Sequence, residues 1–295
     1  MTTSSFYVGD VSDGCPEIKD TSCDLIVTSP PYFKRNGYSD DLMCRLGEVF
    51  ARVLKPGGRA YVIIAQINEK LDRPLDAQRC IMDGGEKNLA PGQTIIWTKS
   101  IAVGGWVEKC PSCQTKTRTE VVSRGHFQPI NSKNLLNYCW EYVLSFVKKP
   151  VKALLPLDRK GIGVAYADKT NITRWANAAD AVHCPGDIWY IPYETTGSSI
   201  KKTHRHEFPV ELARRLIVGS GVSKGSTVFD PFLGGGTTVI TAAQLGMNSL
   251  GYDINENAVN ALRHSWSVGD TGITKCPEDE TKHNGGQNEE ESKHP

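Results

Sequence analysis

The sequence lacks the features that would place it in or across a membrane. None of its 295 residues belongs to an apolar run near the roughly 20 residues that a membrane-spanning helix needs. Residues 1–5 contain neither a basic region nor an apolar core, so the N-terminal segment does not have the pattern of a signal peptide. Charged residues make up 23% of the chain and nearly cancel, with a net charge of +1. We therefore expect a globular protein of the cytoplasm.

The chain has nine cysteines but no pattern that indicates a disulfide framework. Most stand singly in ordinary surroundings, which is typical of reduced thiols in a cytosolic protein. Cys110 and Cys113 form one Cys-x-x-Cys pair, and one such pair supplies only half of a structural zinc site. A second pair does not follow at the usual spacing, and the loose candidates are His126, Cys139, His183 and Cys184. We expect no metal, and name Cys110 and Cys113 as the candidates for zinc.

Short apolar strands alternate with amphipathic helices at both ends of the chain. Apolar residues in 41–54 recur with the period of a helix, and predicted strands at 23–28 and 59–65 flank it. Strand, helix and strand at this spacing form a βαβ unit, which predicts a parallel sheet. The other predicted strands and helices are 6–11, 94–97, 141–147, 209–217, 226–230, 239–245, 248–253 and 256–264. The fold class is therefore α/β, with a doubly wound sheet.

Two long segments, 98–138 and 150–200, lack this regular pattern and are rich in basic, aromatic and polar residues. Irregular segments of such length in a compact protein usually carry function, so we interpret them as insertions. Basic side chains gather near the second segment, which favours a phosphate-bearing partner. The two clusters are Lys148, Lys149, Lys152, Arg159 and Lys160, and Lys201, Lys202, His204, Arg205 and His206. Residues 269–295 are acidic and poor in apolar side chains, so we expect them to be disordered.

A stiff turn follows the predicted strand at 23–28. Its sequence is Ser29-Pro30-Pro31-Tyr32, and the prolines end the strand because they cannot donate ladder hydrogen bonds. The turn places a hydroxyl and an aromatic ring at the carboxyl end of a strand, where open parallel sheets bind ligands. Taken alone, these residues indicate no more than an ordinary proline turn, so their interpretation depends on the rest of the chain.

A glycine-rich turn, Gly234-Gly235-Gly236, joins the strand at 226–230 to the helix at 239–245. Asp253 ends the next strand, and in nucleotide-binding folds an acid at about this spacing accepts hydrogen bonds from ribose hydroxyls. The turn lacks both the Gly-x-Gly-x-x-Gly pattern of dinucleotide sites and the lysine of a P-loop. It is preceded by an acid of its own, Asp230. These features favour a ligand with a ribose and a cationic end, and S-adenosylmethionine satisfies both conditions.

These motifs resemble those of the DNA methyltransferases that methylate exocyclic amino groups. Residues 230–238 resemble their cofactor motif I, and Ser29-Pro30-Pro31-Tyr32 resembles their catalytic motif IV. Motif IV standing before motif I is the order of the β class. Shorter stretches resemble motif III, the segment after motif IV and motif X, and these are 9–11, 54–58 and 202–209. The chain departs from the family pattern at Gly235, where serine is usual, and at 205–206, where Pro-Ala is usual.

The resemblance implies a Rossmann-like S-adenosylmethionine-dependent methyltransferase sheet with one antiparallel strand and an inserted target-recognition region. Residues 1–97 would form the catalytic half of this domain and 201–268 the cofactor-binding half. Residues 98–200 would be mostly the recognition insertion, with one core strand near 141–147, and the acidic tail would follow the cofactor-binding half. The cofactor-binding residues it implies are Asp10, Phe208, Asp230, Phe232, Gly234, Gly236, Thr237 and Asp253. The catalytic residues it implies are Ser29, Pro30, Pro31 and Tyr32.

An exocyclic amine is a poor nucleophile because its lone pair is delocalised into the base. Two acceptors, the Ser29 hydroxyl and the Pro30 carbonyl, can orient its N–H bonds and free that lone pair, and the prolines fix their direction in advance. Serine is too weak a base to ionise the amine, so the proton leaves after the methyl has transferred. Tyr32 offers a face on which a flipped-out base can stack.

Serine at the start of motif IV favours N4 of cytosine in the resembled family, whereas aspartate or asparagine favours N6 of adenine. We therefore expect a site-specific methyltransferase that modifies cytosine N4 in duplex DNA, in a restriction–modification or epigenetic role. The alternatives are N6-adenine methylation, a catalytically silent DNA-binding protein, and an RNA or protein acceptor. The expected partners are double-stranded DNA and a cognate restriction endonuclease without a stable complex. The protein would be a monomer or homodimer that meets the nucleoid through DNA.

Overall fold

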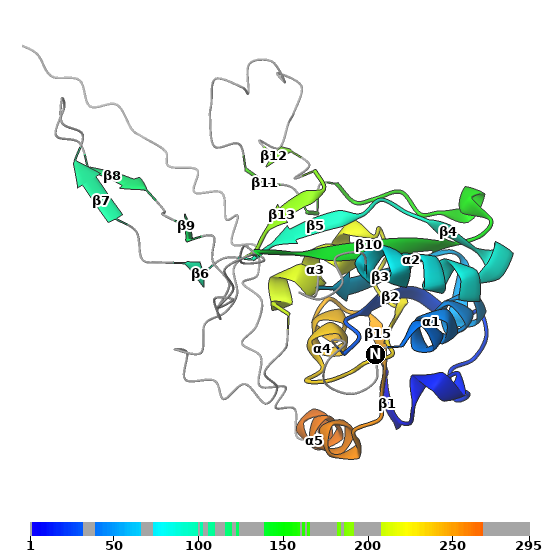
Figure 1. Cartoon of the computed structure of the whole chain (residues 1–295). Coiled ribbons are helices and arrows are strands. Elements are labelled where there is room, and N and C mark those ends of the chain that lie inside the picture. The colour runs from blue at the N-terminus through cyan, green and yellow to red at the C-terminus, as the bar shows by residue number, and fades with distance from the viewer. Residues whose placement is uncertain are drawn as a thin grey trace, which may run out of the picture.

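The computed structural model describes residues 2–31, 39–65, 73–99, 139–159, 161–162, 186–191 and 208–267, and the backbone of six short strands between them. Figure 1 shows a central sheet with helices on both of its faces. The expected doubly wound α/β fold is confirmed. In the described residues, no helix combines the length and apolar character needed to cross a membrane.

The main sheet has nine strands in the order β1-β15-β14-β2-β3-β10-β5-β13, with β4 paired to β10. Their bounds are β1 (Ser4–Val8), β2 (Cys23–Thr28), β3 (Leu54–Ile64), β4 (Leu89–Pro91), β5 (Ile95–Thr98), β10 (Trp140–Lys148), β13 (Ile188–Tyr190), β14 (Thr227–Asp230) and β15 (Asn248–Asp253). Strand β10 is antiparallel to β3, β4 and β5. All the other pairs in this sheet are parallel, as the resemblance implied.

The central strands are apolar at successive positions because both of their faces are covered. Ile26 of β2 and Val62 of β3 pack into one core with α1 (Asp40–Val53) and α2 (Arg73–Gly84). Their chain neighbours Val27 and Ile63 pack into a second core with α3 (Val210–Gly219) and α4 (Thr237–Gln244). Helix α5 (Glu256–Ser267) packs against β1 and β15. Three 3-10 turns complete these layers: η1 (Val11–Asp13), η2 (Glu86–Asn88) and η3 (Val151–Ala153).

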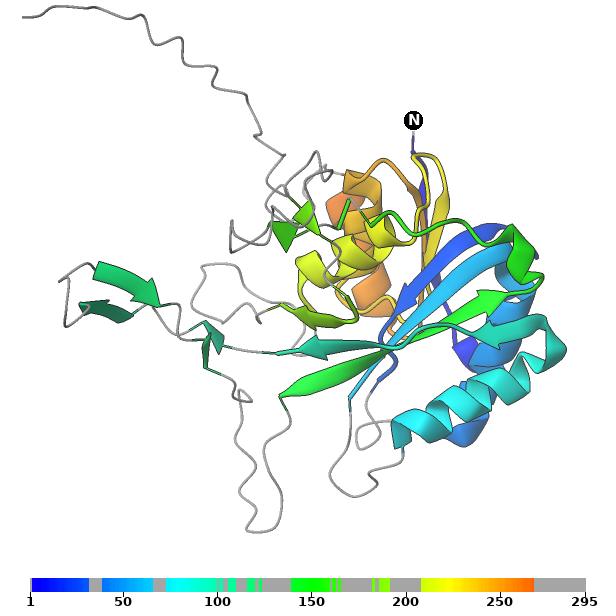
Figure 2. The same cartoon turned by 90° about the horizontal axis from the view of Figure 1, so that it is seen from above.

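The parallel strands end together at one edge, which we call the carboxyl edge. Thr28 ends β2, Asp230 ends β14 and Asp253 ends β15, so the two motif turns and the acid meet there. Figure 2 shows the twist of the sheet from above. Strand β10 runs the other way, and Lys148 at its end pairs with Leu89 at the start of β4. The described part of the first basic cluster therefore lies near the edge opposite the motif turns.

The structure differs from the sequence-based expectations in three places. Helix α2 lies in a stretch for which the sequence analysis predicts neither a helix nor a strand. Strand β3 begins at Leu54, whereas the strand was predicted at 59–65, so residues 54–58 belong to the strand. Strand β13 joins the main sheet from within the segment interpreted as insertion. The remaining strands form three separate pairs: β6 (Ile101–Ala102) with β9 (Val122–Ser123), β7 (Trp106–Lys109) with β8 (Lys116–Thr119), and β11 (Val164–Ala165) with β12 (Val182–His183).

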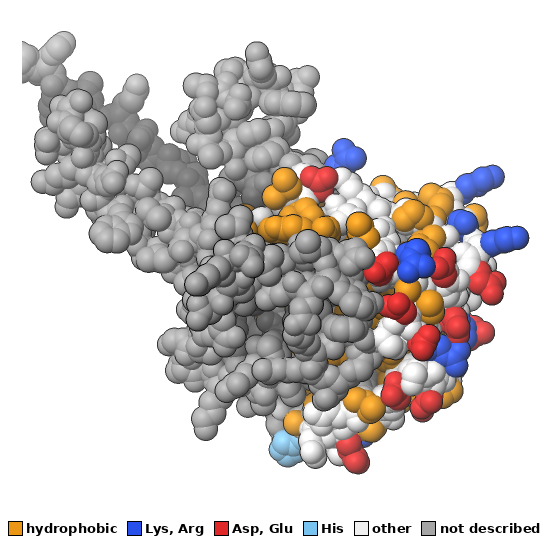
Figure 3. Space-filling model, viewed as in Figure 1, with side chains coloured by type: hydrophobic (Ala, Val, Ile, Leu, Met, Phe, Trp, Pro, Cys, Tyr) orange, Lys and Arg blue, Asp and Glu red, His pale blue; other side chains and the backbone are white. Residues whose placement is uncertain are grey.

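The described surface shows no single-sign field on the face in Figure 3, where acidic and basic side chains alternate over α1, α2 and their surroundings. Two basic side chains of α1 are paired with acids: Arg45 with Glu48, and Arg52 with Asp20. We therefore find no extended basic patch on this described face. The second predicted basic cluster, at 201–206, lies outside the described residues.

Candidate active site

The proline turn continues β2 at the carboxyl edge. Ser29 is half-buried and lines a pocket there, Pro30 is buried, and Pro31 is exposed at the pocket wall. The ring of each proline fixes its own backbone φ, so the chain leaves the strand in a restricted direction. Tyr32 lies outside the described residues. Of the four predicted catalytic residues, Ser29 and Pro31 line the pocket, whereas the buried Pro30 does not.

The glycine turn connects α4 to β14, the strand next to β2 in the sheet. Gly234 has φ of +48°, and a Cβ added there would meet only the Phe232 carbonyl oxygen, at 3.9 Å. Its backbone is thus open to close approach by a ligand. Gly236 serves a different purpose: it is the N-cap of α4 with φ of +85°, and a Cβ there would lie 2.9 Å from the Leu262 side chain. Gly236 does not line the pocket, unlike the other predicted cofactor-binding residues.

The two turns are joined by buried side-chain hydrogen bonds. The Thr28 hydroxyl donates to Asp230 Oδ1 at 2.7 Å, and the Thr238 hydroxyl donates to the Val27 carbonyl at 3.1 Å. The same Asp230 oxygen accepts the Phe232 backbone N–H at 3.0 Å. Asp230 is only 2% exposed, and its burial raises its pKa to about 7. The hydrogen bonds from Thr28 and Phe232 act in the opposite direction and lower the pKa, but the effect of burial is larger.

Asp253 connects the glycine turn to the end of β15. Its Oδ2 accepts the Gly234 N–H at 2.8 Å, and its Oδ1 accepts the Asn255 N–H at 2.8 Å. A carboxylate oxygen has two lone pairs, so these bonds leave acceptor capacity toward the pocket that Asp253 also lines. The acid therefore both shapes the turn and faces the space where a ribose would lie.

Asp10 reaches the pocket from the end of β1. Its Oδ1 caps η1 by accepting the Ser12 N–H at 2.8 Å, which holds the carboxylate in place. Gly9 before it has no room for a side chain, because a Cβ would lie 2.2 Å from the Tyr252 hydroxyl. The turn after β1 is thereby fixed against β15, with the carboxylate of Asp10 lining the pocket.

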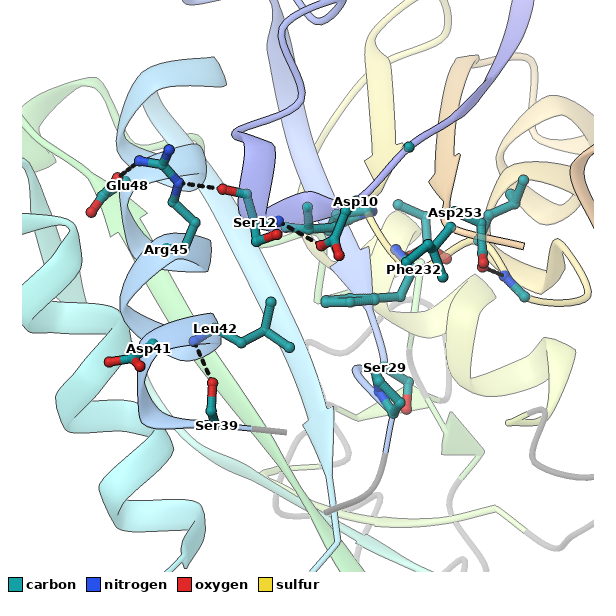
Figure 4. A pocket seen from close by; sticks show the side chains of 18 of the residues that line it. Asp10, Ser12, Ser29, Ser39, Asp41, Leu42, Arg45, Glu48, Phe232 and Asp253 are labelled. Carbon is teal, nitrogen blue, oxygen red and sulfur yellow. Dashed lines mark hydrogen bonds and ion pairs between the residues drawn. The ribbon is translucent and has the colours of Figure 1, made fainter. Parts of the chain in front are cut away.

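The pocket between these turns has a volume of about 920 Å³. Figure 4 shows Leu42 of α1 and Phe232 of the glycine turn extending toward it from opposite sides, with Asp10, Asp253 and Ser29 around it. The predicted cofactor-binding residues that line it are Asp10, Phe208, Asp230, Phe232, Gly234, Thr237 and Asp253. Sequence segments more than 200 positions apart thus form one cavity, with a hydroxyl at one wall and carboxylates at another.

Among the wall residues that the sequence analysis did not select are two apolar side chains that are not buried, Ile254 and Leu42. Ile254 follows Asp253 and is 69% exposed while lining the pocket. An apolar side chain kept open at a cavity is a candidate for contact with a flat ring, and its place directly after the predicted ribose-binding acid was the available signal. Leu42 was assigned to the core stripe of its helix, but it is half-buried and lines the pocket. The helical period alone shows that Leu42 lies on the apolar face of its helix. It does not show whether that part of the face packs in the core or lines a pocket.

Within the described residues no group of three or more His, Cys, Asp or Glu side chains could hold a metal ion. The zinc candidates Cys110 and Cys113 lie outside them. The described cysteines are all free thiols, and Cys15, Cys23 and Cys80 are buried. Burial raises the pKa of the Cys15 thiol to about 12, so this group is an unreactive part of the core.

Two features define the class of Rossmann-like methyltransferases. One is the main sheet with its antiparallel strand β10, and the other is a pocket for a nucleotide-like ligand with Ser29 of the proline turn in its wall. Residues 23–264 match the DNA methylase family whose members modify N6 or N4 amino groups, and the chain belongs to that family. It is thus a DNA amino-methyltransferase, and its cofactor is S-adenosylmethionine. The pocket fits that cofactor in volume, in its open glycine backbone and in its acids.

Individual methyltransferases also resemble this chain, in sequence or in fold. The type II methyltransferase M.MjaI of Methanocaldococcus jannaschii is 28% identical over 282 residues, covering 82% of this chain and 84% of that protein. The PvuII DNA methyltransferase, described as cytosine-N4-specific, superposes with a TM-score of 0.62 at 18% identity, covering 92% of each chain. The protein TTHA0409 of Thermus thermophilus, solved with S-adenosylmethionine, gives a TM-score of 0.57 at 22% identity, covering 92% of this chain and 96% of that one. These two structures share the fold.

Proposed function

We propose that the protein transfers a methyl group from S-adenosylmethionine to N4 of a flipped-out cytosine in duplex DNA. The observation that carries this proposal is the position of Ser29. Its side chain lines the same pocket as Phe232, Gly234 and Asp253, so a base amine held at Ser29 would face a cofactor held by the glycine turn. A serine at this position, in place of an acid, is the feature that favours cytosine over adenine.

For the cofactor we propose contacts that follow the chemistry of the wall. Asp253 would accept the ribose hydroxyls, and Asp10 would accept the exocyclic N–H of the adenine. Phe232, Leu42 and Ile254 offer apolar surface to the adenine ring, and all three line the pocket. The open backbone at Gly234 would let the ligand approach closely. Phe208 would complete the wall near the methionine end.

When bound, S-adenosylmethionine supplies a methyl group activated by the neighbouring sulfonium. The protein's part is to hold the acceptor amine in line with that methyl group. Ser29 Oγ and the Pro30 carbonyl would accept the two N–H bonds of the amine, which turns its lone pair toward the cofactor. Tyr32 would stack on the base. Neither oxygen is basic enough to remove a proton from the neutral amine, so deprotonation follows transfer.

The name type II methyltransferase given to M.MjaI supports a role in a restriction–modification system. We accordingly propose a cognate endonuclease that recognises the same DNA sequence without forming a stable complex. The insertion on the sheet, which begins after β5, would read that sequence. The alternative acceptor is N6 of adenine, which the same family modifies.

Single-molecule sequencing of DNA from cells that express the protein tests this proposal, because it reports the modified base and its sequence context together. We expect N4-methylcytosine at one defined sequence, absent from cells that carry the empty vector. N6-methyladenine at a defined sequence would replace the proposed acceptor with the alternative. A genome without either modification would contradict the proposal.

Cofactor affinity should depend on pH through Asp230. Burial raises the pKa of this carboxyl to about 7, and a cationic cofactor in the pocket that Asp230 lines favours the ionised form. Binding should therefore release a proton near neutral pH. The association constant should rise as pH increases from 6 to 8, by at most about tenfold per unit for one linked proton.

Calorimetric titration at several pH values measures this effect, and the Asp230→Asn protein provides the control. That variant keeps the shape of the side chain but cannot ionise, so its affinity should lack the component due to Asp230. The cofactor's own amino group titrates equally in both experiments and cancels in the comparison. Identical pH profiles for the two proteins would show that Asp230 does not titrate with binding.

A further inference from the structure

The strands that carry the two motif turns are neighbours with a short described register. The described register of β14 on β2 consists of Leu25 with Val228 and Ile26 with Phe229. The two strands then continue to the carboxyl edge, where β2 ends at Thr28 and β14 ends at Asp230. Near that edge, buried side-chain hydrogen bonds add links between the two strands and their turns.

The Thr28–Asp230 contact is the link nearest the turns. Thr28 is 0% exposed and Asp230 is 2% exposed, and the distance between the hydroxyl and Oδ1 is 2.7 Å. A hydrogen bond to a buried carboxyl is stronger than one between neutral surface groups, and it is costly to leave unmade. Thr28 does not line the pocket, whereas its chain neighbour Ser29 does.

One oxygen of Asp230 connects both turns. It accepts the Thr28 hydroxyl, one residue before Ser29, and it accepts the N–H of Phe232, which lines the cofactor pocket. This single atom therefore joins the acceptor turn to the cofactor turn through two hydrogen bonds. The Thr238 hydroxyl adds a second link from α4 to the Val27 carbonyl.

We infer that Thr28 is a positioning residue for methyl transfer, which acts by holding the Ser29–Pro31 turn in register with the cofactor turn through Asp230. This inference rests on the proposed function of Ser29. A bond between cofactor and acceptor sides matters most in the transferring complex, because a displacement of about 1 Å can slow a reaction by roughly 100-fold. It matters less for binding the cofactor, because the proposed contacts with Asp253, Asp10 and the apolar wall do not involve Thr28.

The test compares Thr28→Val, which keeps the shape but removes the hydroxyl, with Thr28→Ser, which keeps the hydroxyl. Thr241→Val is a matched control, because the buried Thr241 hydroxyl donates within α4 to the Thr237 carbonyl at 2.7 Å and joins no two turns. Single-turnover methyl transfer to duplex DNA is measured at saturating cofactor and DNA. Cofactor dissociation constants and thermal unfolding are measured alongside.

For Thr28→Val we expect a rate of transfer lower by about 30- to 100-fold, with a cofactor dissociation constant within about threefold of wild type. Thr28→Ser and Thr241→Val should stay within about threefold of the wild-type rate. If Thr28→Val does not fold, Thr238→Val removes the second link and should show the same split with a smaller loss. A Thr28→Val rate near wild type, or a loss of cofactor affinity as large as the loss of rate, would overturn the positioning role. Absence of transfer by the wild-type protein would instead contradict the proposed function.

Discussion

The Ser29→Ala protein is expected to bind S-adenosylmethionine normally and to transfer its methyl group on the order of 100-fold more slowly, the size of effect seen when one oriented polar group is removed from a transition-state site. Ser29 lies at the pocket wall that faces the glycine turn, and its proposed role is to accept one N–H of the base amine. Removing the hydroxyl leaves the prolines and therefore the course of the backbone unchanged. The loss should appear in the rate constant of transfer at saturating substrates.

Ser22→Ala is the control for this prediction. Ser22 directly precedes the same strand at its other end, where its hydroxyl donates to the Lys19 carbonyl at 2.6 Å. Its replacement removes a serine hydroxyl away from the carboxyl edge, and transfer should proceed at the wild-type rate. A Ser29→Ala protein with an unchanged rate would remove Ser29 from the mechanism, and equal losses in both variants would indicate a general effect on the fold.

The Asp253→Ala protein is expected to bind the cofactor on the order of 100-fold more weakly, because it loses two kinds of interaction at once. The carboxylate holds the Gly234 and Asn255 amides at 2.8 Å each, and we propose that it also accepts the ribose hydroxyls. Hydrogen bonds to a charged group contribute about 1.5–3 kcal/mol each, so losing the ribose contacts alone accounts for this weakening. Calorimetric titration with S-adenosylmethionine measures it directly.

The cofactor affinity of Asp253→Asn should lie between those of the wild type and Asp253→Ala, roughly tenfold weaker than wild type. The amide keeps one acceptor oxygen but loses the charge. Glu256→Ala provides a control three positions away, since Glu256 is exposed in the first turn of α5 and does not line the pocket. Its affinity should match wild type. Normal cofactor binding by Asp253→Ala would contradict the placement of the ribose beside this acid.

The two motif turns could be predicted from the sequence because each is local: a short apolar strand leads directly into a run of prolines or glycines, and a helix follows. The parallel register of β14 on β2 places these two turns on neighbouring strands. Helix α2 could not be predicted in the same way. Its buried apolar positions are few, Ala77, Cys80 and Ile81, and it is held by close approach to α1. A Cβ at Gly84 would lie 1.8 Å from the Cys44 carbonyl oxygen, a contact between helices that no periodicity encodes.

Within the site, the positions of the two turns could be predicted from the sequence, but the separate roles of the residues in each turn could not. Gly234 and Gly236 belong to one glycine run, yet Gly234 opens toward the pocket and Gly236 turns into a helix against Leu262. Asp230 lines the pocket but directs an oxygen inward to Thr28, a residue that sequence reasoning had no cause to select. Such distinctions depend on side-chain directions at the carboxyl edge, which arise from packing between distant segments.

The central claim is that the pocket transfers a methyl group to the N4 amine of cytosine in DNA. Its most direct test is to incubate the purified protein with duplex DNA and S-adenosylmethionine carrying an isotopically labelled methyl group, and to identify the labelled nucleoside by mass spectrometry. We predict labelled N4-methyl-2′-deoxycytidine, formed by the wild-type protein and strongly reduced with Ser29→Ala. Label found in N6-methyl-2′-deoxyadenosine alone, or in no nucleoside, would contradict the claim.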